Sequence, residues 1–201
     1  MFGREDLPRC VCLHSGGLDS AVCLALLAEQ GVTSVPVFLN YGQRALTAEI
    51  ESFERINRQF GLGRSYVFEF PDFGAHIRTG LTDASQDIVS NAFTPNRNLL
   101  FLLLAASVGY QHGISDVVIG LLSAETAIFP DQTDTFLQTA QNALSESLGF
   151  DIVVHTPLRA MTKKRVVDLA NRLGVRQTYS CHVGGPEPCG ECIACKEFEW
   201  G

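Results

Sequence analysis

A six-residue segment near the amino terminus combines glycines, hydroxyls and a carboxylate in a pattern suited to phosphate. The segment consists of Ser15, Gly16, Gly17, Leu18, Asp19 and Ser20, and it follows an apolar run at residues 10–14. Glycines let backbone N–H groups approach an anion closely, and a following helix start adds a favourable dipole. Both serines can donate hydrogen bonds, and Asp19 can hold Mg²⁺ against phosphate oxygens. The spacing fits neither the P-loop nor the dinucleotide fingerprint, and the alternative interpretation is a plain glycine turn.

Four cysteines are crowded into the last 21 residues of the chain: Cys181, Cys189, Cys192 and Cys195. Two overlapping C-x-x-C pairs let tight turns direct several thiolates at one Zn²⁺, and Cys181 completes a tetrahedron. Four sulfur ligands leave no open position, so we predict a structural zinc site in which His182 is not a ligand. The alternatives are plain buried thiols and a thioredoxin-like redox pair, which normally follows a strand at a helix start.

Composition and charge limit the classes of partner. The 201 residues are 46% hydrophobic and 18% charged, as expected for one globular domain with at most a small appendage. With 15 basic and 22 acidic residues the formal charge is −7, which disfavours direct nucleic-acid binding. Residues 1–9 do not resemble a signal peptide, and the longest apolar run, residues 99–108, is too short to span a membrane. We therefore expect a cytoplasmic protein without a membrane partner, whose clustered cysteines bind metal rather than form disulfides.

Short β-rich runs alternate with longer helical patterns, which predicts an α/β fold with a parallel sheet of about five strands flanked by helices. The expected strands are residues 10–14, 34–41, 65–70, 116–121 and 151–155, and the expected helices are residues 21–29, 43–60, 98–112, 133–148 and 162–173. Residues 71–95 show weak periodicity and are expected to form an irregular loop. We expect residues 1–176 to form the α/β domain and residues 177–201 a metal-binding tail packed on it.

Taken together, these features resemble the QueC family of 7-cyano-7-deazaguanine synthases, within the PP-loop ATP pyrophosphatases. The resemblance extends beyond Ser15–Ser20 to residues 40–44, 95–98, 129–131, 156–158 with Lys163, and 178–181 with the cysteine cluster. The hexapeptide alone indicates an adenylating PP-loop enzyme, and its combination with four carboxy-terminal cysteines points to this family. The resemblance implies a Rossmann-like fold of the HUP/PP-loop type.

The resemblance also implies a reaction. Such enzymes use ATP and Mg²⁺ to convert the carboxylate of 7-carboxy-7-deazaguanine into an acyl adenylate. Ammonia then displaces AMP to give an amide, and a second activation dehydrates the amide to the nitrile on the route to queuosine. Family members are commonly homodimers, so a homodimer is expected here as well.

Residue roles follow from the same resemblance. Residues 15–20 would bind ATP, with Asp19 at the reacting phosphates, and Lys163 and Arg97 would be the catalytic cations that contact phosphate or carboxylate. For either cation alone, a solvated surface charge is the alternative. The expected substrate-binding residues are Arg44, Arg97, Asn98 and Asp131.

Two segments depart from the family pattern. The segment Ser-Gly-Tyr-Pro-Asp-Cys-Arg, usual in the family, retains Pro130 and Asp131 but has Gln132 and Thr133 in place of Cys and Arg. Asn96 replaces the glycine that usually precedes the Arg-Asn pair. The changes at Gln132 and Thr133 motivate an alternative, a QueC-like enzyme of CBASS-type antiphage defence that joins the activated deazaguanine to an amino group of a partner protein. A noncatalytic zinc-bearing binding module is the second alternative.

Overall fold

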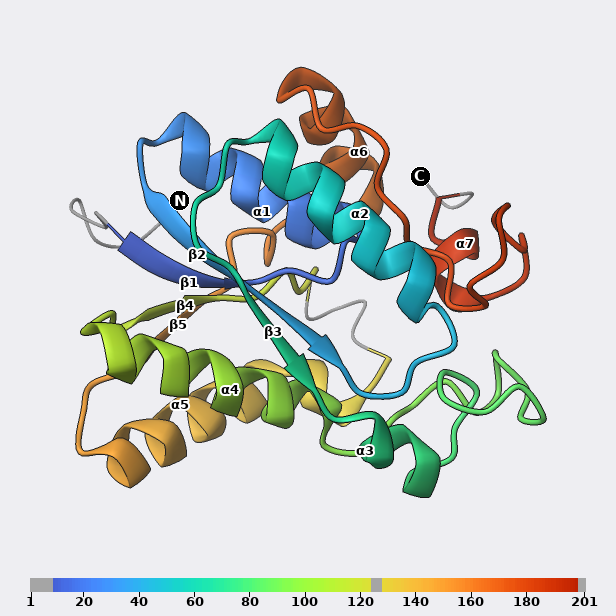
Figure 1. Ribbon diagram of the computed structural model, residues 1–201, viewed down its shortest axis with the longest axis horizontal. Coiled ribbons are helices and arrows are strands. Elements are labelled where there is room, and N and C mark those ends of the chain that lie inside the picture. Colours follow the sequence, from blue (N-terminus) through green and yellow to red (C-terminus); the bar gives the residue numbers. More distant parts are fainter. Residues whose placement is uncertain (1–8, 124–127, 199–201) are drawn as a thin grey trace.

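The computed structural model describes residues 9–123 and 128–198, and at its centre lies one parallel β-sheet (Figure 1). Its five strands follow the order β3-β2-β1-β4-β5. They are β1 (Arg9–Leu13), β2 (Thr33–Asn40), β3 (Tyr66–Glu69), β4 (Asp116–Val118) and β5 (Val153–His155). Val11 of β1 lies opposite Val35 of β2 and Val117 of β4. The predicted parallel α/β fold is therefore confirmed.

Helices cover both faces of the sheet, because its central strands are apolar on both sides. The helices are α1 (Leu18–Glu29), α2 (Leu46–Gln59), α3 (Pro71–His76), α4 (Arg97–His112), α5 (Asp134–Leu148), α6 (Lys163–Arg172) and α7 (Ile193–Lys196), with a 3-10 turn η2 (Pro130–Gln132). One face packs against α1, α2 and α6, and the other against α4 and α5 (Figure 1). Alternate residues of β1 divide between these cores, with Cys10 and Cys12 on the α1 side and Val11 and Leu13 on the α4 side.

Residues 116–121 and 71–95 are two of the segments that differ from the sequence prediction. The predicted fourth strand, residues 116–121, ends at Val118, after which the chain leaves the sheet. A Cβ on Gly120 would lie 3.1 Å from backbone atoms of Asp19 and Ser20, so this segment packs directly on the start of α1. Helix α3 lies within the predicted loop, and its six residues are too few to produce a periodic signal.

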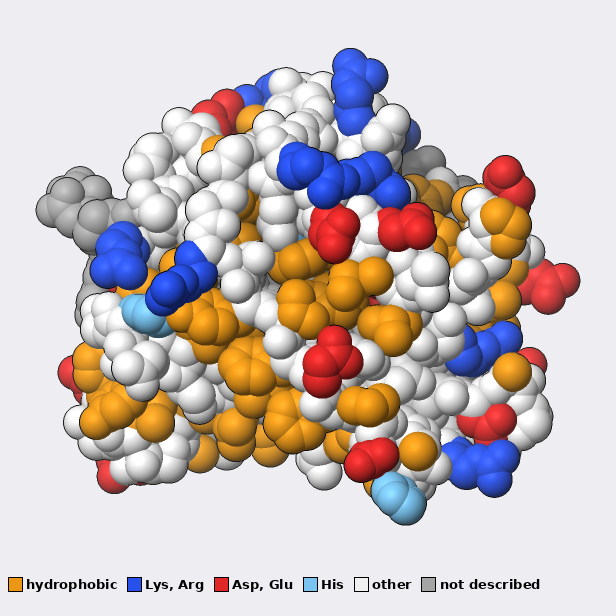
Figure 2. Space-filling model, in the orientation of Figure 1, with side chains coloured by type: hydrophobic (Ala, Val, Ile, Leu, Met, Phe, Trp, Pro, Cys, Tyr) orange, Lys and Arg blue, Asp and Glu red, His pale blue; other side chains and the backbone are white. Residues whose placement is uncertain are grey.

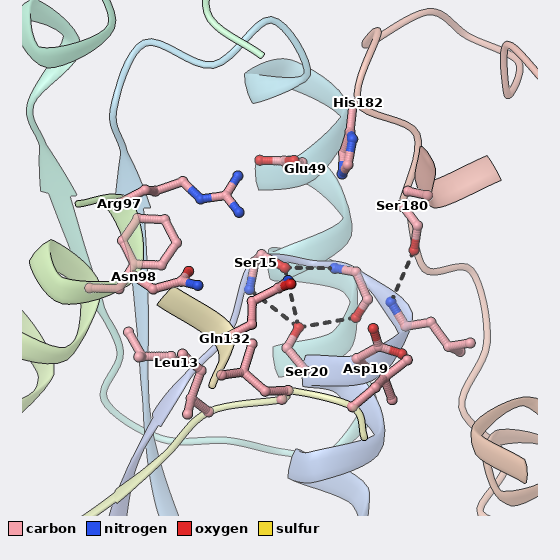
Figure 3. A pocket seen from close by; sticks show the side chains of 18 of the residues that line it. Leu13, Ser15, Asp19, Ser20, Glu49, Arg97, Asn98, Gln132, Ser180 and His182 are labelled. Carbon is pink, nitrogen blue, oxygen red and sulfur yellow. Dashed lines mark hydrogen bonds between the residues drawn. The ribbon is translucent and has the colours of Figure 1, made fainter. Parts of the chain in front are cut away.

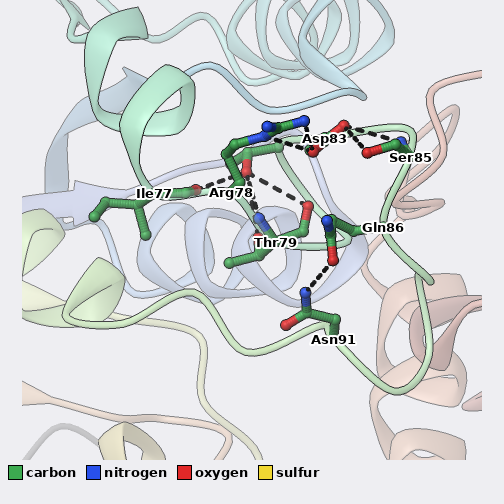
Figure 4. Close-up of polar contacts among 8 residues, drawn as sticks. Ile77, Arg78, Thr79, Asp83, Ser85, Gln86 and Asn91 are labelled. Atoms are coloured by element: carbon green, nitrogen blue, oxygen red, sulfur yellow. Dashed lines mark hydrogen bonds and ion pairs between the residues drawn. The ribbon is translucent and has the colours of Figure 1, made fainter.

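The rest of that predicted loop is irregular and is held by its own polar contacts (Figure 4). Asp83 accepts a hydrogen bond of 2.7 Å from Nε of Arg78, and Asn91 donates one of 3.0 Å to Gln86. The backbone N–H of Gly80 donates to the carbonyl of Asn91 at 2.7 Å, which joins the two ends of the loop. These internal hydrogen bonds give the loop a defined conformation although it has no regular secondary structure.

The tail packs on the same domain (Figure 1). The backbone N–H of Tyr179 donates to the carbonyl of Gly16 at 3.0 Å, and the Oγ of Ser180 accepts from the N–H of Leu18 at 3.2 Å. Residues 1–8 of the predicted α/β domain and residues 199–201 of the predicted tail lie outside the described residues. None of the described helices is both long and apolar enough to cross a membrane.

Apolar side chains gather on the face where the edge strand β3 lies between α2 and α4 (Figure 2). Val67 on β3 is 42% exposed and Leu103 on α4 is 46% exposed. Ion pairs on α2, such as Arg58 with Glu54 at 3.6 Å, flank this face. The free edge of the sheet is therefore apolar, whereas the polar groups that could do chemistry gather at the carboxyl ends of the strands.

Candidate functional site

A cavity of about 280 Å³ opens at the carboxyl ends of β1, β2 and β4. The sheet extends from β1 through β2 to β3 on one side and through β4 to β5 on the other, so the order reverses between β1 and β4. Open α/β sheets bind ligands at this switch point, outside the carboxyl ends of the strands. Leu13 and His14 line the cavity from the end of β1, and Ile119 and Gly120 line it from the segment after β4.

The predicted phosphate-binding segment borders this cavity between β1 and α1 (Figure 3). Gly16 has φ +82°, and a Cβ there would lie 2.4 Å from the carbonyl oxygen of Glu49, so only glycine fits. The Oγ of Ser20 accepts from the N–H of Ser15 at 3.3 Å and donates to the carbonyl of Gly17 at 3.0 Å. The loop therefore presents the first turn of α1, where backbone N–H groups lack intrahelical partners, to the cavity.

Lys163 supplies a cation beside this loop. Its Nζ lies 2.8 Å from both carboxylate oxygens of Asp19 and 2.9 Å from Glu197, which follows α7 in the tail. The side chain of Lys163 is 10% exposed. Lys163 is the first residue of α6, and Thr162 caps this helix. Burial alone would lower the pKa of Lys163, but the two carboxylates outweigh it and raise the pKa above its ordinary value, so the ammonium stays charged.

Arg97 occupies another side of the cavity (Figure 3). Its guanidinium carbon lies 5.8 Å from the ring centre of Tyr41 and 5.9 Å from that of Phe101, within the range of cation–π attraction. The buried Nε of Arg97 has no hydrogen-bond partner among the described residues. A buried, unpaired donor on a charged group costs free energy, so this guanidinium is available to an anionic or hydrogen-bonding ligand.

The other predicted substrate-binding residues take different places. Asn98 lines the cavity, and its side-chain amide donates to the carbonyl of Asp131 at 3.1 Å. Asp131 is itself behind this layer, where its carboxylate accepts from the backbone N–H of Asn98 at 3.4 Å. Arg44 does not line the cavity either, and it donates to the carbonyl of Gly80 at 3.0 Å. Arg44 and Asp131 therefore support cavity walls, whereas Arg97 and Asn98 face the cavity.

Besides His14, four acidic or basic residues that sequence reasoning did not assign to this site line the cavity: Glu49, Arg159, His182 and Glu197. Glu49 shares one helical face with the buried Phe53 and Ile56, four and seven residues later. A glutamate on such an apolar face is a signal that could have been read from the sequence. His182 and Glu197 each lie within two residues of a clustered cysteine, and only the packing of the tail brings them to the cavity.

His14 also lines the cavity and has no role in the sequence prediction. Its Nδ1 lies 2.9 Å from the Oγ of Ser20, while its buried Nε2 has no partner among the described residues. Burial lowers the pKa of His14 to about 3, so the imidazole is neutral at physiological pH. It is therefore a hydrogen-bonding group, and not a cation, beside the predicted phosphate-binding loop.

The four clustered cysteines form a second polar centre. The Sγ atoms of Cys181, Cys189, Cys192 and Cys195 all lie within 4.8 Å of one another. A tetrahedral zinc site, with Zn–S of about 2.3 Å, needs sulfurs about 3.8 Å apart, and the Sγ atoms of Cys189 and Cys195 are 3.9 Å apart. His182 is not one of this group. The donor set therefore fits a structural zinc ion.

Backbone N–H groups surround these sulfurs. Cys189 Sγ accepts from the N–H of Glu191 at 3.4 Å and of Cys192 at 3.3 Å, and Cys181 Sγ accepts from the N–H of Cys189 at 3.4 Å. Burial raises the pKa of Cys181, but the N–H groups of Cys189 and Val183 outweigh it and lower that pKa to about 6. Such donors stabilise thiolates, the form that binds metal.

Comparison with known proteins identifies the family of the chain. The family model described as "Queuosine biosynthesis protein QueC" matches residues 9–200. The chain belongs to the QueC family. The 7-cyano-7-deazaguanine synthase of Campylobacter jejuni subsp. doylei is 31% identical over 204 residues, which cover 93% of this chain and 90% of that protein. The resemblance seen in the sequence is therefore confirmed, and so is the prediction of a synthase-like enzyme.

Solved structures show the same fold at lower identity. The U34-tRNA thiolase NcsA from Methanococcus maripaludis has a TM-score of 0.61 and 17% identity, covering 96% of this chain and 64% of that one. The NMN synthetase from Francisella tularensis has a TM-score of 0.60 and 14% identity, covering 96% and 76% respectively. These similarities confirm the PP-loop type of fold.

Proposed function

We propose that this chain uses ATP to activate the carboxylate of 7-carboxy-7-deazaguanine, with ammonia as acceptor and 7-cyano-7-deazaguanine as product. The observation that carries the proposal is one cavity that combines a phosphate-binding loop and Lys163 with a separate buried guanidinium, that of Arg97. A carboxylate is a poor electrophile, and an acyl adenylate turns its oxygen into part of a good leaving group. Cationic groups for both reactants in one cavity support this chemistry.

The phosphate side of the cavity is assigned to ATP. The N–H groups of residues 15–20 and the ammonium of Lys163 would hold the departing pyrophosphate, whose negative charge grows as the P–O bond breaks. Asp19 would hold Mg²⁺, since its carboxylate borders the cavity and is 26% exposed. The metal ion would neutralise phosphate charge. Lys163 would then exchange its contact with Asp19 for contacts with phosphate oxygens.

The opposite side of the cavity is assigned to the deazaguanine. Arg97 would bind the substrate carboxylate or its adenylated form, and Asn98 would contact polar atoms of the purine-like ring. Arg44 and Asp131 would act indirectly, by holding the loop at Gly80 and the side chain of Asn98. After aminolysis to the amide, a second activation in the same cavity would remove water to give the nitrile.

The remaining sequence predictions are retained as proposals. We assign residues 1–176 to the α/β domain and residues 177–201 to a tail that binds one structural Zn²⁺ through its four cysteines. We also propose a homodimer located in the cytoplasm, with no membrane or direct nucleic-acid partner. Metal analysis of the purified protein tests the zinc assignment, and light scattering tests the homodimer.

One incubation tests the reaction. The protein is mixed with ATP, Mg²⁺, ammonium and 7-carboxy-7-deazaguanine, and the products are separated and weighed by mass spectrometry. We expect AMP, pyrophosphate and the nitrile, each dependent on the deazaguanine carboxylate. If pyrophosphate release does not depend on that carboxylate, the proposed substrate is wrong.

We further propose, as an alternative, that the acceptor is an amino group of a partner protein, as in QueC-like antiphage defence enzymes. Gln132 and Thr133 favour this alternative. They replace the family's Cys and Arg, and their side chains hydrogen-bond to backbone N–H groups of the same segment. The Oε1 of Gln132 accepts from the N–H groups of Ile128 and Phe129, and Thr133 caps α5 by accepting from the N–H of Phe136. Formation of AMP without nitrile, together with added mass on a partner protein, would support the alternative over ammonia.

A further inference from the structure

The carboxyl group of Glu49 has no role in the reaction described so far. It lies in the first turn of α2 and lines the cavity, where its Oε2 accepts a hydrogen bond of 2.9 Å from the side-chain amide of Gln43. In the view of Figure 3, this carboxyl group lies between the side chains of Arg97 and His182. It therefore faces the part of the cavity assigned to the substrate carboxylate, away from the pair formed by Lys163 and Asp19.

The surroundings of Glu49 favour a carboxyl group that exchanges protons near neutral pH. Burial raises its pKa to about 7, against the opposing effects of the Gln43 hydrogen bond and the positive charge of Arg97. The other titratable groups facing it are Tyr41, from the turn before α2, and His182, from the tail. Arg97 supplies a positive charge on this side of the cavity.

We propose that Glu49 is the general base of the aminolysis step, accepting the proton that the attacking amine must lose. The nitrogen lone pair forms the C–N bond at the acyl carbon, and the C–O bond to the phosphate of AMP breaks, so that AMP leaves with that electron pair. The nitrogen then carries one proton more than the amide, and the Glu49 carboxylate takes it. The protonated carboxyl group later returns this proton to water.

This assignment rests on the proposed function and deepens it. The step is the same for ammonia and for a protein amino group, because both must lose a proton to become an amide nitrogen. General-base catalysis by a placed side chain typically contributes about 10²- to 10⁴-fold, and it is most effective when the pKa of the base lies near the working pH.

A structural role for Glu49, as the hydrogen-bond acceptor that orients Gln43, is the competing interpretation. The substitution Glu49→Gln separates the two, because an amide oxygen still accepts from Gln43 but does not take up a proton at neutral pH. The matched control is Glu54→Gln on the same helix, an exposed position whose carboxylate pairs with Arg58 at 3.6 Å.

The test measures the two half-reactions separately in the full-length, metal-loaded protein. Carboxylate-dependent exchange of labelled pyrophosphate into ATP reports adenylate formation, and amide release with ammonium reports aminolysis. For Glu49→Gln we expect exchange within a few-fold of the unsubstituted protein and aminolysis slower by about 10²-fold or more. An equal loss in both half-reactions, or no loss in aminolysis, would overturn the base assignment.

Two further readouts distinguish a base from a structural group. Expressed per concentration of free NH3, the rate of aminolysis should rise with pH through about 7 in the unsubstituted protein and in Glu54→Gln, and this rise should be lost in Glu49→Gln. Hydroxylamine, a nucleophile that is neutral and needs less help from a base, should restore most of the rate to Glu49→Gln. If the unsubstituted protein forms no adenylate of the deazaguanine, the proposed function fails. If adenylate forms and Glu49→Gln behaves as the control does, only this inference fails.

Discussion

Replacing Gly16 by alanine should distort the phosphate-binding loop, because two constraints meet at this residue. Its φ of +82° is a conformation that residues with a Cβ rarely adopt, and a Cβ would lie 2.4 Å from the carbonyl oxygen of Glu49. The neighbouring atoms, the backbone nitrogen of Phe53 and the Cβ of Ser52, would each be 3.0 Å away. These contacts belong to the body of α2 and do not yield as a flexible side chain does.

The expected cost follows from this geometry. The left-handed conformation costs about 1–2 kcal/mol for a residue with a Cβ. Ordinary van der Waals contact begins at 3.4 Å, so the loop or α2 must also move by about 1 Å, and forced packing of this kind costs about 1–3 kcal/mol. The sum of about 2–5 kcal/mol corresponds to a Tm lowered by roughly 4–20 °C in a chain of this size. A displacement of about 1 Å at reacting groups also slows catalysis by about 10²-fold.

Gly31→Ala is the matched control. Gly31 follows α1 with φ +71°, but a Cβ there would meet no atom within 4 Å. We therefore expect only the conformational cost, a Tm lowered by roughly 2–8 °C, and unchanged pyrophosphate exchange. Thermal unfolding and exchange assays on both variants test this reasoning. Equal Tm losses and equal exchange rates would show that the close approach of α2 is not what requires glycine at Gly16.

Four other changes have distinct expected outcomes. Asp19→Ala should abolish pyrophosphate exchange with little change in Tm, because Lys163 keeps its contact with Glu197; continued exchange would contradict the phosphate-site assignment. Lys163→Met should leave the carboxylates of Asp19 and Glu197 without their shared cation, destabilising the protein by about 1–3 kcal/mol in urea unfolding at pH 8. Glu197→Gln should lower the pyrophosphate exchange rate several-fold by loosening Lys163, and an unchanged rate would show that Asp19 alone suffices. Cys192→Ser should remove bound zinc, measured by elemental analysis, and lower the Tm; retention of one zinc per chain would refute the four-sulfur site.

Much of the fold follows from local pattern. The apolar run at residues 10–14 and the periodic segment at residues 98–112 lie within one residue of β1 and α4, because burial on both faces of a strand, or around a helix, imposes long apolar signals. The end of β4 at Val118 did not follow from the sequence. Residues 119–121 are as apolar as a strand, but they leave the sheet where Gly120 packs on α1.

What the sequence alone determined is the chemistry that a short segment contains. Residues 15–20 and the four cysteines from Cys181 to Cys195 predict their ligands because each set is close along the chain and needs only turns to converge. The contact between Lys163 and Asp19 joins residues 144 positions apart, and only the parallel sheet, which gathers the carboxyl ends of its strands at one edge, brings them within 2.8 Å. The same packing places the apolar face of α2 against the sheet, so that Glu49 on this face lines the cavity. These contacts between residues distant in sequence form because helices pack on both apolar faces of the sheet, and no local sequence pattern predicts them.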